Sequence, residues 1–214
     1  MSSKDVILIW GWVKDDKSYD RFIASTPAGY KIHPVSIEQV APRGYTEEFT
    51  ERLEVLLKQK GLDNVILVAH SLGAALALKF AAKHPKRIDR MVVSDAVGLN
   101  RERSFLHLMW CLIRSHFQEK GKVEGKHIST VFKLFRKPIL LSRFVGLVET
   151  IDVSSELGKL EVPYMILWGE KDVVTPLPHG LPGRLVVLEG MDHNWILHSP
   201  QLFWENTKGF IDAD

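Results

Sequence analysis

Cysteine, net charge and long apolar runs are all scarce in this sequence, and each scarcity excludes a class of protein. Cys111 is the only cysteine in 214 residues, so no disulfide can form within the chain, which suits a reducing compartment. The formal charge is only +2, so the overall charge gives no support to a role in binding nucleic acid. The first residues lack the basic region, the long apolar segment and the cleavage site of a secretory signal. We therefore expect a cytoplasmic protein.

Apolar residues are plentiful but they come in short runs. They make up 45% of the chain, which is enough to bury a sizeable core, and the length is typical of a single domain. No run approaches the length of a helix that spans a bilayer, so stable insertion into a membrane is not expected.

Short apolar runs, each ended by glycine, an acid or a polar loop, alternate with helical patterns along most of the chain. This alternation predicts an α/β fold with a mostly parallel six-stranded sheet flanked by helices. Pro34 cannot donate a hydrogen bond, so its strand is expected at an edge of the sheet. Ligand sites in such sheets gather at the carboxyl ends of the strands. The six predicted strands are residues 6–10, 30–35, 65–68, 90–94, 164–168 and 184–188.

Residues 99–155 interrupt the alternation and contain no predicted strand. Between residues 101 and 143, ten Lys or Arg stand against three Asp or Glu, and the apolar residues recur at helical spacing. We expect a helical cap at 99–155, inserted into a core formed by residues 1–98 and 156–214. Its basic residues are interpreted either as the solvated faces of amphipathic helices, or as a surface that attracts an anionic substrate or makes weak contact with a membrane.

The chain is organised around residues 64–82, NVILVAHSLGAALALKFAA. A β-branched run predicts a buried strand, and the Ala/Leu-rich run that follows predicts a buried helix. Ser71 lies at the junction, two residues from Ala69 and from Gly73. A sharp turn from strand to helix admits only small neighbours and exposes the serine hydroxyl as a candidate nucleophile, although a serine here is also typical of a helix N-cap.

A serine nucleophile needs a base and an acid that orients the base. Asp172 follows the predicted strand 164–168 in the loop GEKD, and His193 follows 184–188 in the loop GMDHNW. Both loops are expected at carboxyl ends of strands. Asp95, at the end of 90–94, and Asp192, beside His193, remain alternative acids. His70 is expected to pack near the turn rather than to transfer protons.

Together these motifs resemble those of the α/β-hydrolase fold, in particular its capped small serine esterases. The strand-AHSLG-helix turn, GEKD followed by Pro176, and GMDHNW followed by Pro200 occur in that family's order. The resemblance implies Ser71 as nucleophile, His193 as base and Asp172 as acid. It also implies an oxyanion hole formed by the backbone N–H groups of Leu72 and Trp12, with Trp10-Gly11-Trp12 in place of the usual His-Gly loop.

The resemblance implies hydrolysis of small-molecule esters of small or medium apolar acyl groups, without a cofactor and without nucleic acid as partner. Thioester hydrolysis, carbon–carbon bond hydrolysis and a receptor role on the same scaffold remain alternatives. The nine histidines include no compact metal-ligand motif, so no metal site is expected. Three tryptophans are interpreted either as walls of an acyl pocket or as core residues: Trp12, Trp110 and Trp195.

Overall fold

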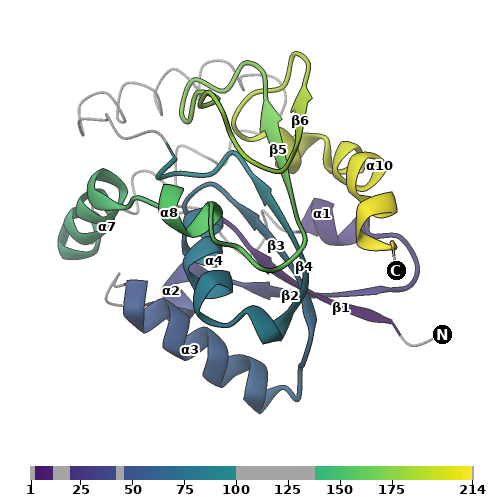
Figure 1. Cartoon of the computed structure of the whole chain (residues 1–214), viewed down its shortest axis with the longest axis horizontal. Coiled ribbons are helices and arrows are strands. Elements are labelled where there is room, and N and C mark those ends of the chain that lie inside the picture. Colours follow the sequence, from purple (N-terminus) through teal and green to yellow (C-terminus); the bar gives the residue numbers. More distant parts are fainter. Residues whose placement is uncertain (1–2, 12–19, 42–45, 100–137, 214) are drawn as a thin grey trace.

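Six parallel strands form one sheet at the centre of the molecule (Figure 1). This computed structural model describes residues 3–11, 20–41, 46–99 and 138–213. The strands are β1 (Lys4–Ile9), β2 (Tyr30–Val35), β3 (Val65–His70), β4 (Ile88–Ser94), β5 (Tyr164–Gly169) and β6 (Arg184–Leu188). The helices are α1 (Asp20–Ala24), α2 (Ile37–Val40), α3 (Thr46–Gln59), α4 (Leu72–Lys83), η2 (Pro85–Arg87), α7 (Pro138–Thr150), α8 (Ser154–Leu157), α9 (Trp195–His198) and α10 (Pro200–Ile211). All six predicted strands are confirmed.

The order of the strands across the sheet is β2-β1-β3-β4-β5-β6. The strand β2 lies at one edge, as the proline at position 34 predicted, and Pro34 pairs with Leu8 of β1. The chain adds β2 on one side of β1 and β3 on the other, so the order reverses between β1 and β3. In parallel sheets this reversal opens a crevice at the carboxyl ends of the two strands, where ligands bind.

Alternate residues of the inner strands pack into two separate apolar clusters, one on each face of the sheet. Ile7 and Ile9 belong to one cluster, whereas Val6 and Leu8 belong to the other. The same alternation holds in β3, β4 and β5, because successive side chains of a strand point to opposite faces. A continuous apolar run is therefore required, since both faces are covered.

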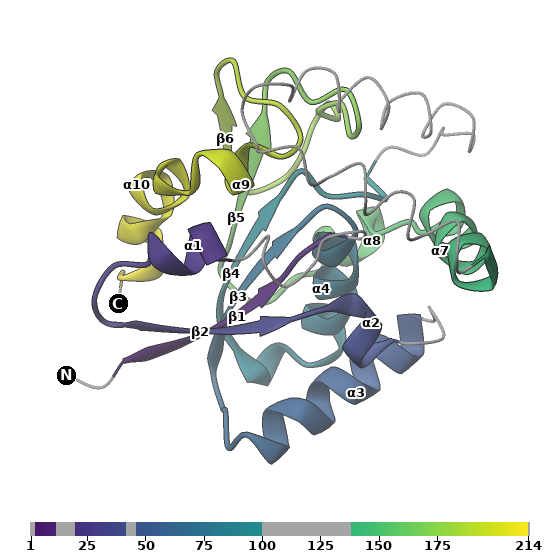
Figure 2. The ribbon, with the colours of Figure 1, turned by 180° about the vertical axis from the view of Figure 1, so that it is seen from behind.

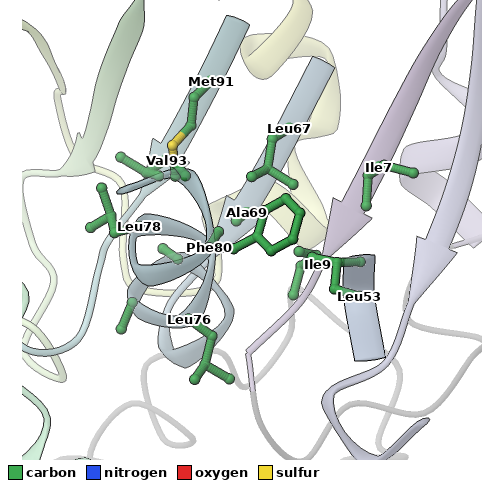
Figure 3. Packing of buried hydrophobic residues seen from close by; sticks show 14 of the residues in the cluster. Ile7, Ile9, Leu53, Leu67, Ala69, Leu76, Leu78, Phe80, Met91 and Val93 are labelled. Carbon is green, nitrogen blue, oxygen red and sulfur yellow. The ribbon is translucent and has the colours of Figure 1, made fainter. Parts of the chain in front are cut away.

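Helices cover both faces (Figures 1 and 2). The helices α2, α3, α4 and α8 pack together on one face, and α1, α9 and α10 pack together on the other. Figure 3 shows part of the first cluster, in which the ring of Phe80 reaches from α4 toward Leu67 and Ala69 of β3. The Ala-rich sequence of α4 lets this helix lie close to the sheet, and nine of its residues are buried.

Most of the expected cap, residues 99–155, lies outside the described residues. The helix α7 falls within that range, and α8 begins at its end. Lys79 of α4 and Glu156 of α8 form an ion pair of 2.5 Å, which fastens α8 to the face of the sheet that α4 covers. Across the described ranges, no helix combines the length and the apolar character needed to cross a bilayer.

Candidate active site

Ser71 occupies a sharp turn between β3 and α4. Its φ of 57° and ψ of −126° lie in a region that non-glycine residues rarely adopt, and such strain gathers at functional sites. The hydroxyl makes no capping hydrogen bond to the helix, so the N-cap interpretation does not describe this serine. The prediction of small neighbours holds at Gly73, where a Cβ would lie 2.5 Å from the carbonyl oxygen of Trp10.

The side chain of His193 reaches Ser71 from the loop after β6. Its Nε2 lies 3.0 Å from Ser71 Oγ, and its Nδ1 lies 2.8 Å from Asp172 Oδ2. A carboxylate only accepts hydrogen bonds, so Nδ1 carries the hydrogen and Nε2 of the neutral ring accepts from the serine hydroxyl. The structure thus brings Ser71, His193 and Asp172 together in a hydrogen-bonded chain.

Asp172 is held rigidly by the turn that follows it. Its Oδ1 accepts from the backbone N–H groups of Val174 and Thr175 at 2.7 and 2.8 Å, and its Oδ2 accepts from the Thr175 hydroxyl. Burial alone would raise the pKa of Asp172, but the neighbouring His193 and the hydrogen bonds outweigh burial and lower it. Asp172 therefore stays ionised beside the imidazole ring.

Thr175 is a site residue that the sequence interpretation missed. Its hydroxyl oxygen lies 3.1 Å from His193 Nδ1, and it is buried. Its position three residues after Asp172 is the available signal, because Asp and Thr at that spacing are typical of a side-chain-stabilised turn.

Asp95, the first alternative acid, is fully buried but faces other donors. It accepts from the N–H of Gly169 and from the indole N–H of Trp195, both at 2.8 Å. Burial and the charge of Asp172 raise the pKa of Asp95 to about 7. Asp95 therefore connects the ends of β4 and β5 through its hydrogen bonds. Trp195 is fully buried, so it is a core residue rather than a wall of a pocket.

Asp192, the second alternative acid, hydrogen-bonds to its own loop and to α9. Its Oδ1 lies 3.0 Å from the N–H of Asn194 and 3.0 Å from His198 Nε2. This carboxylate shapes the loop that carries the base.

His70 precedes Ser71 and is buried, with 2% of its surface exposed. Its Nε2 lies 2.7 Å from the carbonyl oxygen of His193. His70 packs near the turn, as expected from the sequence, but the sequence did not indicate this hydrogen bond.

The groups expected to form the oxyanion hole are described only in part. Leu72 is the first residue of α4, where backbone N–H groups have no partner within the helix. Trp12 lies outside the described residues, as does Trp110. Gly11 is described, and a Cβ there would lie 2.7 Å from Ser71 Cβ. The loop after β1 therefore passes directly against the serine.

Among the described residues, Asp95, Asp172 and His193 form a group whose candidate ligand atoms all lie within 4.8 Å of one another. Their oxygens already accept hydrogen bonds from N–H and O–H donors. The arrangement suits a hydrogen-bonded acid–base pair better than a bound cation.

Comparisons with known proteins agree with the fold. A model of the alpha/beta hydrolase fold matches residues 21–112. An uncharacterized protein of Mycobacterium tuberculosis is 25% identical over an alignment of 200 positions, which covers 74% of this chain and 59% of that protein. The chain thus spans about three fifths of the length of this relative.

Two further similarities extend over nearly the whole chain. A pimeloyl-[acyl-carrier protein] methyl ester esterase of Nitrosomonas europaea is 23% identical over 232 positions, covering 93% of this chain and 92% of that protein. The solved structure of a 2-hydroxy-6-oxo-6-phenylhexa-2,4-dienoate hydrolase from Rhodococcus superposes with a TM-score of 0.77 at 16% identity, covering 99% of this chain and 91% of that one. At this identity the superposition shows the fold.

Proposed function

We propose that this chain, a member of the α/β-hydrolase fold family, is a serine hydrolase that cleaves carboxylic esters through an acyl-enzyme. The observation that carries the proposal is the hydrogen-bonded chain from Ser71 Oγ through His193 to Asp172, with distances of 3.0 and 2.8 Å. A nucleophile, a base and an orienting acid in this order are the minimum for acyl transfer through serine.

In this mechanism His193 moves one proton in each half of the reaction. Its Nε2 takes the proton of Ser71 Oγ while the oxygen attacks the acyl carbon, and then delivers it to the leaving alcohol. Water repeats the sequence on the acyl-enzyme, which releases the acid and restores the serine. The ionised Asp172 keeps the hydrogen of His193 on Nδ1 and stabilises the imidazolium as it forms.

The negative charge that develops on the substrate oxygen needs preorganised donors. We assign this role to the backbone N–H groups of Leu72 and Trp12. Leu72 begins α4, where the helix dipole favours negative charge. The close approach of Gly11 to Ser71 supports the assignment of Trp12, because Trp12 is the next residue along the same loop.

For the substrate we propose esters with a small or medium, largely apolar acyl group, bound between the core and a cap formed by residues 99–155. Val148 of α7 and Val173 both pack against Val174, which lies two residues after Asp172. An apolar surface therefore adjoins the loop of the acid. The name of the Nitrosomonas relative, a methyl ester esterase, favours an ester over a thioester. We also propose a cytoplasmic location, on the basis of the single cysteine.

Labelling with a fluorophosphonate, followed by intact mass, tests the nucleophile. We expect one adduct on the parent protein and on Ser25→Ala, a control at a serine directly after α1, and no adduct on Ser71→Ala. Labelling that persists in Ser71→Ala would overturn the assignment.

Turnover of short p-nitrophenyl esters tests the activity. Steady multiple turnover, slower as the acyl chain grows beyond medium length, is expected. A single stoichiometric burst would instead favour a receptor, and faster cleavage of matched thioesters would change the substrate class.

A further inference from the structure

We propose that His70 is a positioning residue, which fixes the main chain of His193 relative to Ser71, and that Trp10 holds the ring of His70 in place. The inference rests on the proposed function, since it assigns to His70 the alignment of the base with the nucleophile. It concerns a residue that takes no part in the proton transfers.

The evidence begins with the hydrogen bond between His70 Nε2 and the carbonyl oxygen of His193, at 2.7 Å. A carbonyl oxygen only accepts, so the hydrogen lies on Nε2 of His70. Both residues are buried, with exposed fractions of 2% and 5%. A hydrogen bond shielded from water is stronger than an exposed one, and its loss leaves a buried carbonyl without that donor.

One peptide bond and two hydrogen bonds link His70, Ser71 and His193 into a closed circuit. His70 and Ser71 are joined by a peptide bond, the His70 side chain binds the main chain of His193, and the His193 side chain binds Ser71 Oγ at 3.0 Å. The imidazole rings also lie against each other, with centroids 4.9 Å apart. Because these links form a closed circuit, a shift of the His193 backbone away from Ser71 would have to break a buried hydrogen bond.

Trp10, the residue after β1, also contacts the ring of His70. Its ring meets the ring of His70 edge to face, with centroids 5.9 Å apart and an interplanar angle of 84°. Trp10 is itself fully buried and makes a second edge-to-face contact with Phe22 of α1 at 5.6 Å. The His70 ring thus contacts both an aromatic side chain of the core and the ring of His193.

The loop of His193 requires such support because it follows an edge strand. Loops are held less firmly than the elements that they connect, and an error of about 1 Å in a reacting group costs on the order of a hundredfold in rate. Other hydrogen bonds, such as that from Lys171 N–H to the carbonyl of Met191 at 2.8 Å, tie the loop to the β5 side of the site. The bond from His70 ties His193 itself to the side of the nucleophile.

Four substitutions distinguish the effect of the His70 hydrogen-bond donor from the effect of its aromatic ring. His70→Phe keeps an aromatic ring but has no donor, whereas the amide of His70→Gln can still reach the carbonyl. His70→Asn carries an amide that is too short, and it replaces the Phe variant in the comparison with Gln if the Phe variant does not fold. His84→Gln is the matched control, because it removes a histidine at the far end of α4, about 18 Å along the helix.

In steady-state kinetics on a p-nitrophenyl ester, we expect His70→Phe and His70→Asn to lower kcat roughly ten- to hundredfold with little change in KM. His70→Gln should recover most of the loss, and His84→Gln should match the parent. A parental kcat in the Phe or the Asn variant, or equal losses in the Asn and Gln variants, would overturn the proposal.

A second measurement is independent of turnover. The proton on His193 Nδ1, bound to Asp172, should give a far-downfield proton NMR resonance, assigned by its absence in His193→Gln. We expect this resonance to shift or broaden in the Phe and Asn variants and to persist in Gln and in His84→Gln. An unchanged resonance in the Phe and Asn variants would refute the role of His70. If the parent hydrolyses no ester, the proposed function fails, but this comparison still tests the alignment of His193.

Discussion

Asp172 and Asp95 are two buried carboxylates near one histidine, and their different hydrogen-bond partners give them different roles. Asp172 accepts from His193 Nδ1 at 2.8 Å, whereas Asp95 accepts from Gly169 and Trp195. We expect Asp172→Asn to lower kcat by roughly three to four orders of magnitude, because an amide cannot hold the imidazole in the productive tautomer. Asp95→Asn should change kcat less than about tenfold on the same scale. A collapse of kcat in Asp95→Asn alone would show that the wrong carboxylate has been assigned.

Asp95 also predicts a dependence of stability on pH. Its pKa is raised from 3.8 to about 7 in the folded protein, so between these pH values the folded state holds a proton that the unfolded state has lost. The free energy of unfolding therefore falls as pH rises through this window, in total by something on the order of a few kcal/mol. Removing the carboxyl group should remove this fall.

We accordingly expect the stability of Asp95→Asn, relative to the parent, to rise from pH 4 to pH 7 and then to level off in urea denaturation. An amide beside the indole N–H of Trp195 adds a cost that is the same at every pH, so the trend is the quantity to measure. Asp89→Asn, which removes an exposed carboxylate from the same strand, is the control and should show no such trend. A flat or falling difference for Asp95→Asn would contradict the prediction.

At the scale of the elements, the carboxyl ends of the strands are where the backbone approaches the site most closely. A Cβ on Gly11 would lie 2.7 Å from Ser71 Cβ and 3.1 Å from Oγ. A Cβ on Gly169, at the end of β5, would lie 2.7 Å from the carbonyl oxygens of Met191 and Asp192. Both positions therefore require glycine, because neither has space for a side chain.

From this geometry we predict that Gly11→Ala folds but loses more than about a hundredfold in kcat/KM, because the serine or the loop must shift by an ångström or more. The control is Gly209→Ala in α10, where a Cβ meets no atom within 4 Å beyond the adjoining backbone of its own helix. That variant should keep its activity and gain up to about 1 kcal/mol of stability from helix propensity. Parental activity in Gly11→Ala would mean that the loop can move away from the serine without loss.

The whole molecule is held together by two apolar clusters that share one sheet. Phe80 belongs to the cluster on the α4 face and Phe203 to the cluster on the α10 face, and both are fully buried. We expect Phe80→Ala and Phe203→Ala each to cost about 3–5 kcal/mol, with one cooperative transition in urea. Val55→Ala, at a side chain that is 50% exposed, should change stability by less than about 1 kcal/mol. Two separate transitions would show that the two layers unfold independently.

The basic residues between 101 and 143 give the whole chain its one marked asymmetry of charge. If they are solvated faces of helices, kcat/KM for an anionic ester should not change between low and high salt, and this is the result that we expect. A fall in kcat/KM for an anionic ester at high salt, where exposed charges are screened, would instead support attraction of the substrate by this segment.

Local sequence was sufficient for the strands, for the helix that follows residues 65–68 and for the sharp turn at Ser71. A run such as residues 65–68 is apolar throughout because both faces of its strand are covered, so the pattern itself indicates a buried parallel strand. The turn at Ser71 was recognisable because only small residues fit two positions away, and the close approach at Gly73 bears this out. These features depend on residues that are close together in the chain, so they can be recognised from the sequence alone.

The partners of each polar group depended on the tertiary structure. Asp95, Asp172 and Asp192 all stand near strand ends in the sequence, and the hydrogen bonds alone distinguish the carboxylate that faces His193 Nδ1. The bond from His70 to His193 joins residues 123 positions apart, and no local pattern encodes a contact of that kind. The physical reason is that secondary structure follows from short-range sterics and burial, whereas the direction of a buried donor is set by how distant segments pack.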